Sequence, residues 1–138
     1  MSTTTTAPLT VTDAETLILA ARRAADAAGV PASITVLDAG GNLLAFRRDE
    51  RAVLISGETS TAKAYTALQL NAPTADLVDL SSRTALPLPA HRAEQALLFI
   101  AGGVPIRRDG QLIGALGLGG GAPEQDHAFA TAALKELG

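Results

Sequence analysis

Residues 104–129, VPIRRDGQLIGALGLGGGAPEQDHAF, decide the fold of this chain. Two mainly apolar runs, 104–107 and 111–118, flank the dipeptide Asp109-Gly110. An Asp-Gly pair between two such runs favours a tight turn, because both residues tolerate the positive φ that the turn needs. This stretch therefore predicts a β-hairpin, in which the two strands are antiparallel.

The glycines that follow this hairpin lead into a predicted C-terminal helix. Pro123 suits the first helical position, because the N–H that it lacks would be unpaired there. Glu124 and Asp126 fall in the first turn and Lys135 in the last, so that their charges oppose the helix dipole. We expect residues 119–121 to form a strand-to-helix turn in which glycine permits positive φ and close approach.

A second hairpin is predicted nearer the N-terminus. Ile34 and Val36 alternate with polar neighbours, residues 38–42 have the composition of a turn, and residues 43–47 run back. Both hairpins have glycine in the turn, and together they indicate a sheet with antiparallel pairing.

Two longer helices complete the regular pattern. Thr12 and Glu15 have the spacing of a capping box, and apolar residues then recur at helical spacing up to Gly29. Ser56 is predicted to cap a helix that runs to about Leu70, where an Asn-Ala-Pro sequence stops it. Thr74 and the residues that follow predict a short third helix through Leu80.

The order of these elements predicts an α+β fold, with a single antiparallel sheet of about five strands flanked by helices on both sides. The fifth strand is residues 97–100, whereas residues 81–96 fit no regular pattern. Residues 1–10 are rich in Ser and Thr and are expected to form a disordered tail. Residues 11–138 are then a single domain.

Composition excludes several classes of function. The chain has 138 residues, a net charge of −3, no cysteine and only 3% aromatic residues. Thiolate chemistry and cysteine-held metals are therefore excluded, and nucleic-acid binding is not expected because basic runs and stacking rings are missing. Without a signal peptide pattern or a run of about 18 apolar residues, we expect a cytoplasmic protein that does not enter a membrane.

Three blocks of the chain, residues 36–50, 61–68 and 101–134, together resemble the haem-binding, or haem-degrading-like, domain family. The resemblance covers about residues 10–137. It implies an antiparallel sheet with helices on both sides, a homo-oligomer that is often a tetramer or octamer, and haem as a ligand. The glycine block reads GLGGG here, whereas relatives tend to have G-x-S-G-G, so one hydroxyl that could orient a ligand is missing.

Two residues of the middle block are candidates for ligand contact. Lys63 lies in the family-like sequence A-K-A-x-T, and its ammonium could pair with a carboxylate such as a haem propionate. The other interpretation of Lys63 is a solvated helix lysine. Tyr65 could stack on or ligate a porphyrin, or could be a buried core ring.

The two histidines, His91 and His127, are candidates for the iron ligand, since haem can take a single axial histidine. Neither has a metal-ligand partner at close spacing. His127 also follows two acidic residues, so that Asp126 and His127 could move a proton or simply form an ion pair.

Gly119, Gly120 and Gly121 precede a helix N-terminus, whose free amides attract anions. A phosphate loop is not expected, because no Lys-Ser/Thr pair follows. The amides could still hold a carboxylate, or the glycines could serve geometry alone.

Two functions follow as hypotheses. The first is a small oligomeric protein that binds haem or a related ligand and takes part in haem or iron handling. The second is a cofactor-independent enzyme on a small carboxylated or oxidised metabolite, with Lys63 and residues 119–121 holding the substrate. A non-catalytic subunit that acts by assembly is a third possibility, since its helices are rich in Ala and Leu.

Overall fold

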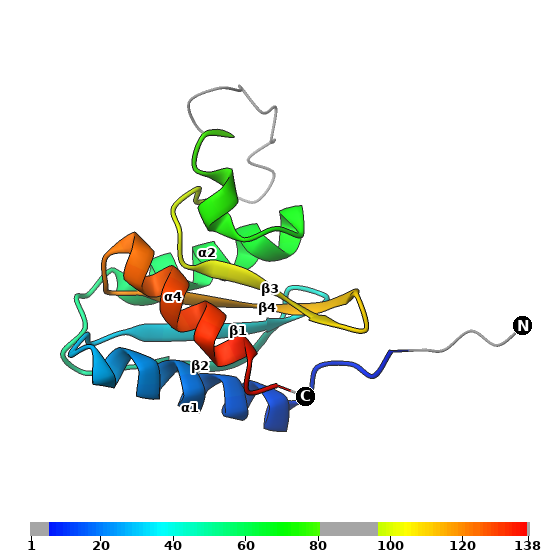
Figure 1. The fold of residues 1–138 in the computed structure, drawn as a ribbon, viewed down its shortest axis with the longest axis horizontal. Helices are drawn as coiled ribbons and strands as arrows, with labels where there is room; N and C mark the ends of the chain where they lie inside the picture. Colours follow the sequence, from blue (N-terminus) through cyan, green and yellow to red (C-terminus); the bar gives the residue numbers. More distant parts are fainter. Residues whose placement is uncertain (1–5, 81–96, 138) are drawn as a thin grey trace, which may run out of the picture.

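The structure is a computed structural model, and it describes residues 6–80 and 97–137. Helices and β-hairpins follow one another along the chain in the predicted order, except for the strand expected at residues 97–100 (Figure 1). Their bounds are α1 Val11–Ala27, β1 Ser33–Asp38, β2 Leu43–Arg48, α2 Ser56–Leu70, the 3₁₀ helix η1 Thr74–Leu77, β3 Gly103–Arg108, β4 Gln111–Gly119 and α4 Pro123–Leu134.

The strands of the described ranges form one antiparallel sheet of four strands in the order β2-β1-β4-β3. Both predicted hairpins are confirmed, and β4 pairs with β1 to join them. The predicted fifth strand at residues 97–100 is wrong. The N–H of Leu98 donates to the hydroxyl of Thr66 on α2 at 2.8 Å, so this segment lies against a helix instead of joining the sheet.

Side chains along each strand alternate between the two faces of the sheet, and each face has its own hydrophobic core. Ile34 and Val36 of β1 face the larger core, which includes residues of α1 and α4. Leu37 and Ala115 face a smaller core with residues of α2. Helices therefore cover both faces of the sheet, with α1 and α4 on one side and α2 on the other, as predicted (Figure 1).

The start of α1 differs from the prediction by two residues. The capping box is formed by Thr10 and Asp13, not by Thr12 and Glu15. The N–H of Thr10 donates to Asp13 Oδ2, and the N–H of Asp13 donates to Thr10 Oγ1, both at 3.0 Å. Leu9 is also buried in the larger core, so ordered packing begins within the segment expected to be a tail.

The expected caps of the next two helices are wrong, because their hydroxyls bond across the fold. Ser56 is the first residue of α2, and its Oγ is 2.8 Å from Ser33 Oγ on β1. Thr74 accepts the N–H of Gly103 at 2.9 Å, and η1 is a short 3₁₀ helix that ends before Leu80. The predicted end of α1 is confirmed: Gly29 follows the cap residue with a φ of +70°.

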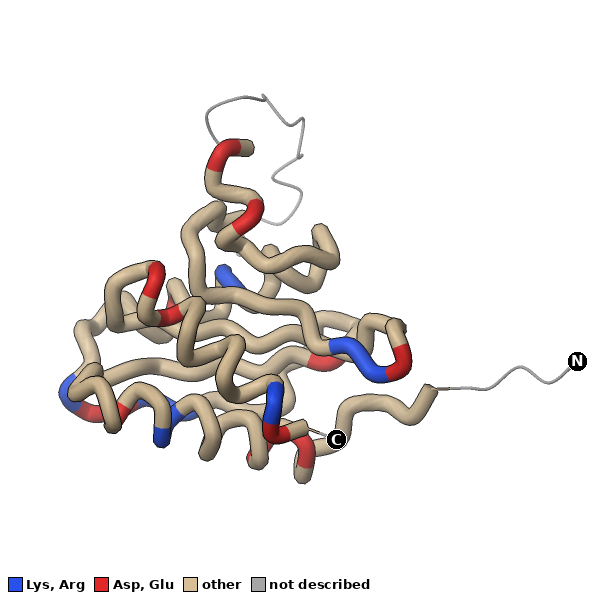
Figure 2. Tube along the Cα trace, in the orientation of Figure 1, with Lys and Arg blue, Asp and Glu red and all other residues tan. Residues whose placement is uncertain are grey.

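Charged positions lie mostly around the outside of the fold (Figure 2). A mixed group of basic and acidic positions gathers at the left end of this view, where α1 ends and β2 leads into the link to α2. Within residues 6–80 and 97–137, no helix is long and apolar enough to cross a membrane.

Candidate functional site

Helix α2 packs closely against the sheet because the strand beneath it, β4, carries glycine where the helix crosses. A Cβ on Gly117 would overlap the carbonyl oxygen of Ser60, and a Cβ on Gly119 would overlap the Ser56 carbonyl oxygen and the Thr59 hydroxyl. These glycines of the 114–121 block therefore serve close packing of helix on strand. Gly119 itself lies beneath α2.

Hydroxyl pairs line the same interface. Thr35 Oγ1 on β1 lies 2.8 Å from Ser60 Oγ and 3.0 Å from Thr61 Oγ1 on α2. Because buried hydroxyls are costly without partners, these bonds satisfy polar groups that face a sheet of small side chains. The register of α2 on the sheet is thus set by both shape and hydrogen bonding.

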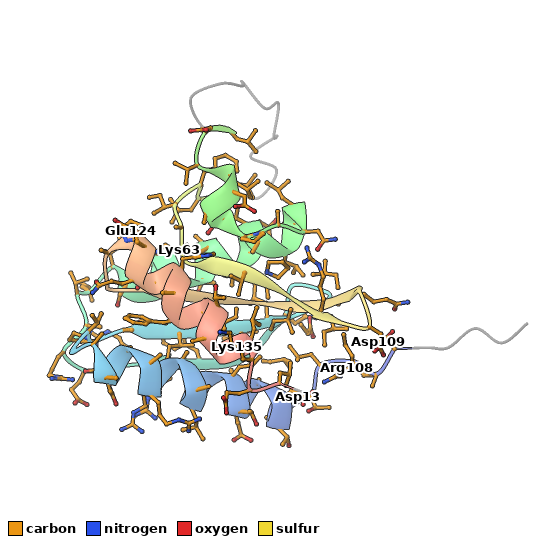
Figure 3. The ribbon with its side chains drawn as sticks, viewed as in Figure 1. Asp13, Lys63, Arg108, Asp109, Glu124 and Lys135 are labelled. Atoms are coloured by element: carbon orange, nitrogen blue, oxygen red, sulfur yellow. The ribbon has the colours of Figure 1, made fainter. Side chains whose placement is uncertain are left out.

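This position of α2 on the sheet brings the side chain of Lys63 into contact with α4. Its Nζ lies 3.1 Å from Asp126 Oδ2, and both side chains are buried, with 5% and 1% exposed. The second oxygen of Asp126 accepts the backbone N–H of Gly121 at 3.1 Å. Figure 3 shows Lys63 near the start of α4, which carries Asp126 and Glu124.

Burial raises the pKa of the Asp126 carboxyl above its ordinary value, and the Lys63 ammonium and the Gly121 N–H act in the opposite direction. A buried pair of this kind is costly to break, because either partner alone would be an uncompensated buried charge. The pair can hold α2 to α4, and the Asp126 carboxylate can accept a proton.

The structure thus brings together two of the three residues expected to be catalytic. The third, His127, is next to Asp126 in α4 and is partly buried. Its Nδ1 is buried and has no hydrogen-bond partner among the described residues. Among the residues that the structure describes, no group of three or more His, Cys, Asp and Glu side chains could hold a metal ion. A histidine ligand on iron stays a prediction, and His91 lies outside the described residues.

The remaining candidates have mainly packing contacts. Tyr65 is 8% exposed and belongs to the smaller core with Leu68. Gly120 has a φ of +116°, and a Cβ there would lie 2.5 Å from the Pro31 carbonyl oxygen. The N–H of Gly121 is used by Asp126. Ligand binding by these four positions, Gly119 included, stays a prediction.

A groove that the sequence analysis missed runs between β2 and α2. Its volume is about 780 Å³. Glu58, Thr59 and Thr61 supply its polar rim. Its apolar walls are formed by Leu43, Phe46, Ile55, Ala62, Leu97 and Leu98.

One sign of an exposed apolar surface was present in the sequence, as an apolar run in an expected link, and Ile55 at the end of this run lines the groove. Val53, Leu54 and Ile55 are 60%, 86% and 57% exposed, and Leu43 and Phe46 of β2 are also exposed. A connection normally carries polar side chains, so three exposed apolar residues in a row indicate a binding surface.

Comparisons with known proteins agree with this fold. A sequence model of the family described as haem degrading protein HbpS-like matches residues 9–135. The chain is 34% identical over 132 residues to an uncharacterised 15.0 kDa protein from the dhaT-dhaS intergenic region of Citrobacter freundii, which covers 93% of this chain and 91% of that protein. It is also 35% identical over 136 residues to the corrinoid adenosyltransferase PduO of Salmonella typhimurium, covering 97% of this chain but only 40% of PduO.

Among solved structures, a complex of PduOC with haem superposes with a TM-score of 0.83 at 30% identity. The match covers 95% of this chain and 96% of that one. Three independent comparisons therefore agree over nearly the whole chain, and the chain belongs to the HbpS-like family of haem-degrading proteins.

Proposed function

We propose that this protein binds haem and takes part in haem or iron handling. Support comes from the family and from the similar PduOC chain, whose structure is a complex with haem. The observation in this molecule that carries the proposal is the apolar groove between β2 and α2. Its volume of about 780 Å³ lies within the range of small-molecule sites.

The lining of this groove fits an apolar macrocycle. Phe46, Ile55 and Leu97 offer an aromatic ring and aliphatic side chains, so burial of apolar surface would supply most of the binding free energy. Bound haem would supply an iron centre, whose axial ligand sets what chemistry is available. Of the described side chains that line the groove, none is a histidine, so His91 and His127 remain proposed ligands from the sequence alone.

Haem titration of the purified protein tests the proposal. We expect a saturable shift of the Soret band. Phe46→Glu, which places a charge on the groove wall, should weaken haem binding at least tenfold. Leu19→Glu is the matched control, because Leu19 is 45% exposed, similar to Phe46 at 43%, but lies on α1.

Absence of a Soret shift in the unmodified protein would overturn haem binding. Equal weakening by both variants would overturn the groove as its site. His91→Ala and His127→Ala then test the axial ligand, because loss of a histidine ligand changes the visible spectrum while the protein still binds the macrocycle.

The second candidate function, a cofactor-independent enzyme on a small carboxylated metabolite, is favoured by one observation. Lys63 is buried, yet its Nζ has one hydrogen-bond acceptor, Asp126, among the residues that the structure describes. An ammonium carries three donors, so two remain for a substrate carboxylate. Asp126 and His127 would then be the groups that move a proton.

A panel of small carboxylates, assayed by turnover and by thermal shift, tests this second function. Lys63→Arg keeps the positive charge, so we expect it to fold and to lose activity because the larger guanidinium changes the geometry. Unchanged turnover in Lys63→Arg would argue against a substrate contact at Lys63.

A further inference from the structure

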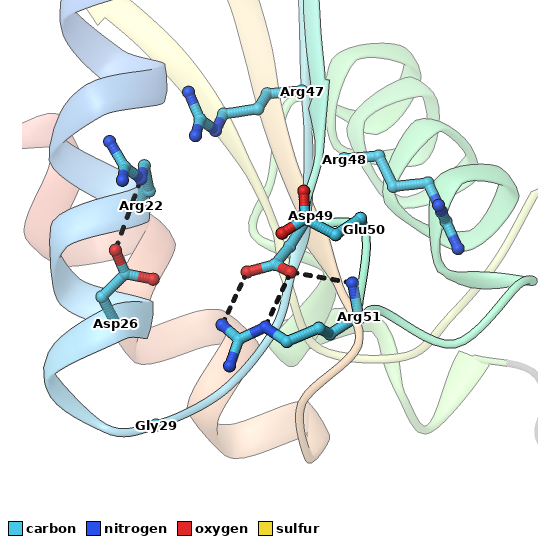
Figure 4. Close-up of a pocket in the computed structure, with 8 residues that line it drawn as sticks. All are labelled: Arg22, Asp26, Gly29, Arg47, Arg48, Asp49, Glu50 and Arg51. Atoms are coloured by element: carbon cyan, nitrogen blue, oxygen red, sulfur yellow. Dashed lines mark hydrogen bonds and ion pairs between the residues drawn. The ribbon is translucent and has the colours of Figure 1, made fainter.

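A second pocket lies on the opposite side of β2 from the groove. It has a volume of about 320 Å³ and lies between the end of α1 and the end of β2 (Figure 4). Its eight lining residues include four arginines and three acidic residues, Asp26, Asp49 and Glu50, so the basic side chains are in excess by one. The arginines are Arg22, Arg47, Arg48 and Arg51.

Three of these arginines are already engaged. Arg22 pairs with Asp26 one turn along α1, with 3.3 Å between Nε and Oδ2. The Arg51 guanidinium donates two hydrogen bonds to the Asp49 carboxylate, from Nε to Oδ1 at 3.2 Å and from Nη2 to Oδ2 at 3.0 Å. The Arg48 guanidinium donates to the carbonyl oxygen of Ala52 at 2.8 Å.

Arg47 is the exception. Within residues 6–80 and 97–137 it makes no hydrogen bond and no ion pair, although Asp49 and Glu50 line the same pocket. The hydrogen bonds from Arg51 are the main cause that lowers the pKa of the Asp49 carboxyl, and the charge of Arg47 acts on it only at longer range, as one of the smaller causes. Figure 4 shows its side chain extending from β2 towards the helix that carries Arg22. A guanidinium has five N–H donors in a planar fork that matches carboxylate or phosphate oxygens.

Side-chain alternation places Arg47 apart from the proposed haem groove. Arg47 is paired with Ile34, which faces the α1 side of the sheet, whereas Phe46 is paired with Thr35, which faces α2. The pocket lies at the C-terminal end of α1. Two backbone carbonyl oxygens there, those of Ala25 and Asp26, already accept N–H groups from residues 28–30, so they are not free oxygens that would repel an anion.

We propose that this pocket binds a small oxyanion with two negative charges, and that Arg47 is its principal contact. The guanidinium of Arg22 stands opposite as a second donor, since its pairing with Asp26 uses only Nε. The pocket volume suits a phosphate ester or a short dicarboxylate. This inference goes beyond the proposed haem function and does not depend on it.

Titration of ¹⁵N-labelled protein with inorganic phosphate, and separately with succinate, tests the site. Ionic strength is held constant with sodium chloride, because screening alone changes the signals of exposed charges. We expect saturable shifts of the Arg47 Nε–H and the Gly29 amide. Tighter binding of phosphate or of succinate identifies the ligand as a phosphate or a carboxylate, and either result supports the site.

Arg47→Gln should lower the affinity for the preferred anion at least tenfold. Arg47→Lys keeps the charge but lacks the planar set of N–H donors, so its affinity should lie between those of Arg47→Gln and the unmodified protein. Arg23→Gln is the control: Arg23 lies on α1 next to Arg22 and carries the same charge as Arg47, but it does not line the pocket. The affinity of Arg23→Gln for the anion should be within twofold of that of the unmodified protein.

Failure of both anions to saturate overturns the proposal, and so does equal weakening by Arg47→Gln and Arg23→Gln. Haem titration of Arg47→Gln separates this site from the haem site. We expect unchanged haem affinity, so loss of anion binding with haem binding intact assigns the pocket to the anion alone. A matching loss of haem affinity overturns the proposal that the two sites are separate.

Discussion

Lys63 and Asp126 form a buried ion pair that joins α2 to α4. The two residues are 63 positions apart in the chain and meet at 3.1 Å between α2 and the start of α4. Burial of a single carboxylate would leave it without the hydration it has in water, and Lys63 together with the Gly121 N–H replaces that hydration.

We expect Lys63→Met to lower the free energy of unfolding by about 3–5 kcal/mol at pH 7, because Asp126 is left as an unpaired buried charge. The loss should be smaller at pH 5, since Asp126 without its ammonium partner can take up a proton on folding. Urea denaturation followed by circular dichroism measures both values.

The double variant Lys63→Met/Asp126→Leu should recover most of the lost stability, because neither charge is then buried alone. Lys135→Met is the control, as Lys135 is the other lysine of the chain and is exposed. A loss as large in Lys135→Met as in Lys63→Met would contradict the role of the buried pair.

Asp13 is a second residue whose charge state matters, at the start of α1. The N–H of Thr10 is the main cause that holds the pKa of Asp13 below its ordinary value of 3.8, with help from the Thr10 hydroxyl and the Arg108 guanidinium. Arg108 Nη2 lies 3.3 Å from Asp13 Oδ2, and both residues are labelled at the same end of the molecule in Figure 3.

A lowered pKa in the folded state means that this carboxylate stabilises the fold above pH 3.8, and that the stabilisation is lost as pH falls below that value. Asp13→Asn should therefore cost about 0.5–1 kcal/mol at pH 6 and progressively less below pH 3.8. Chemical denaturation at several pH values measures the difference.

Glu15→Gln removes the same charge two residues further along α1 and should leave stability within about 0.5 kcal/mol of the unmodified protein. Glu15 is exposed and is not part of the capping box that the structure contains. If Glu15→Gln reproduced the pH-dependent loss, the box at Thr10 and Asp13 would not explain it.

At the scale of elements, the contact between α2 and β4 depends on glycine. Gly117 lies beneath the Ser60 carbonyl oxygen and the Ala64 side chain, and no Cβ fits there unless α2 moves away from the sheet. Moving α2 would also strain the Ser33–Ser56 and Thr35–Ser60 hydroxyl pairs and the Lys63–Asp126 pair, since all three use the same helix.

Gly117→Ala should lower the free energy of unfolding by about 1–3 kcal/mol, because an added methyl overpacks a rigid interface. Gly57→Ala is the contrast. A Cβ there would lie 3.1 Å from the Phe46 ring, which is exposed and can rotate aside. We expect a change of less than about 1 kcal/mol in Gly57→Ala, and thermal melting of the two variants compares them.

At the scale of the whole molecule, Val53 and Leu54 are exposed apolar side chains that lie outside the groove and have no partner surface within the described part of the protomer. We propose that a second copy of the chain covers them, in keeping with the oligomer that the family resemblance implies. Leu54 is the more exposed of the two at 86%, so it gains more from burial in an assembly.

Leu54→Glu should shift the molar mass measured by light scattering after gel filtration from that of a tetramer or octamer to a smaller species, because a charge would be buried in the interface. Val11→Glu is the control, since Val11 is 54% exposed on α1. A monomeric mass for the unmodified protein would contradict the assembly.

Much of this molecule could be predicted from short-range pattern. Asp109-Gly110 predicted its hairpin, and Pro123 predicted the start of α4, because turn geometry and helix ends depend on a few adjacent residues. Residues 97–100 misled the prediction, because a short apolar run fits a strand or a segment packed on a helix equally well, and only the Thr66 hydroxyl that meets Leu98 decides between them.

The candidate sites divide in the same way. The sequence by itself determined the α+β class, both hairpins and the family, and it singled out Lys63 and Asp126 as residues that could carry chemistry. Only the tertiary structure decided that these two meet as a buried pair, that the glycine block of β4 lies beneath α2, and that a groove and an arginine pocket lie on opposite faces of β2. The physical reason is that turns and caps arise from neighbours in the chain, whereas desolvation, charge pairing and pocket shape arise from residues that only the packed fold brings together.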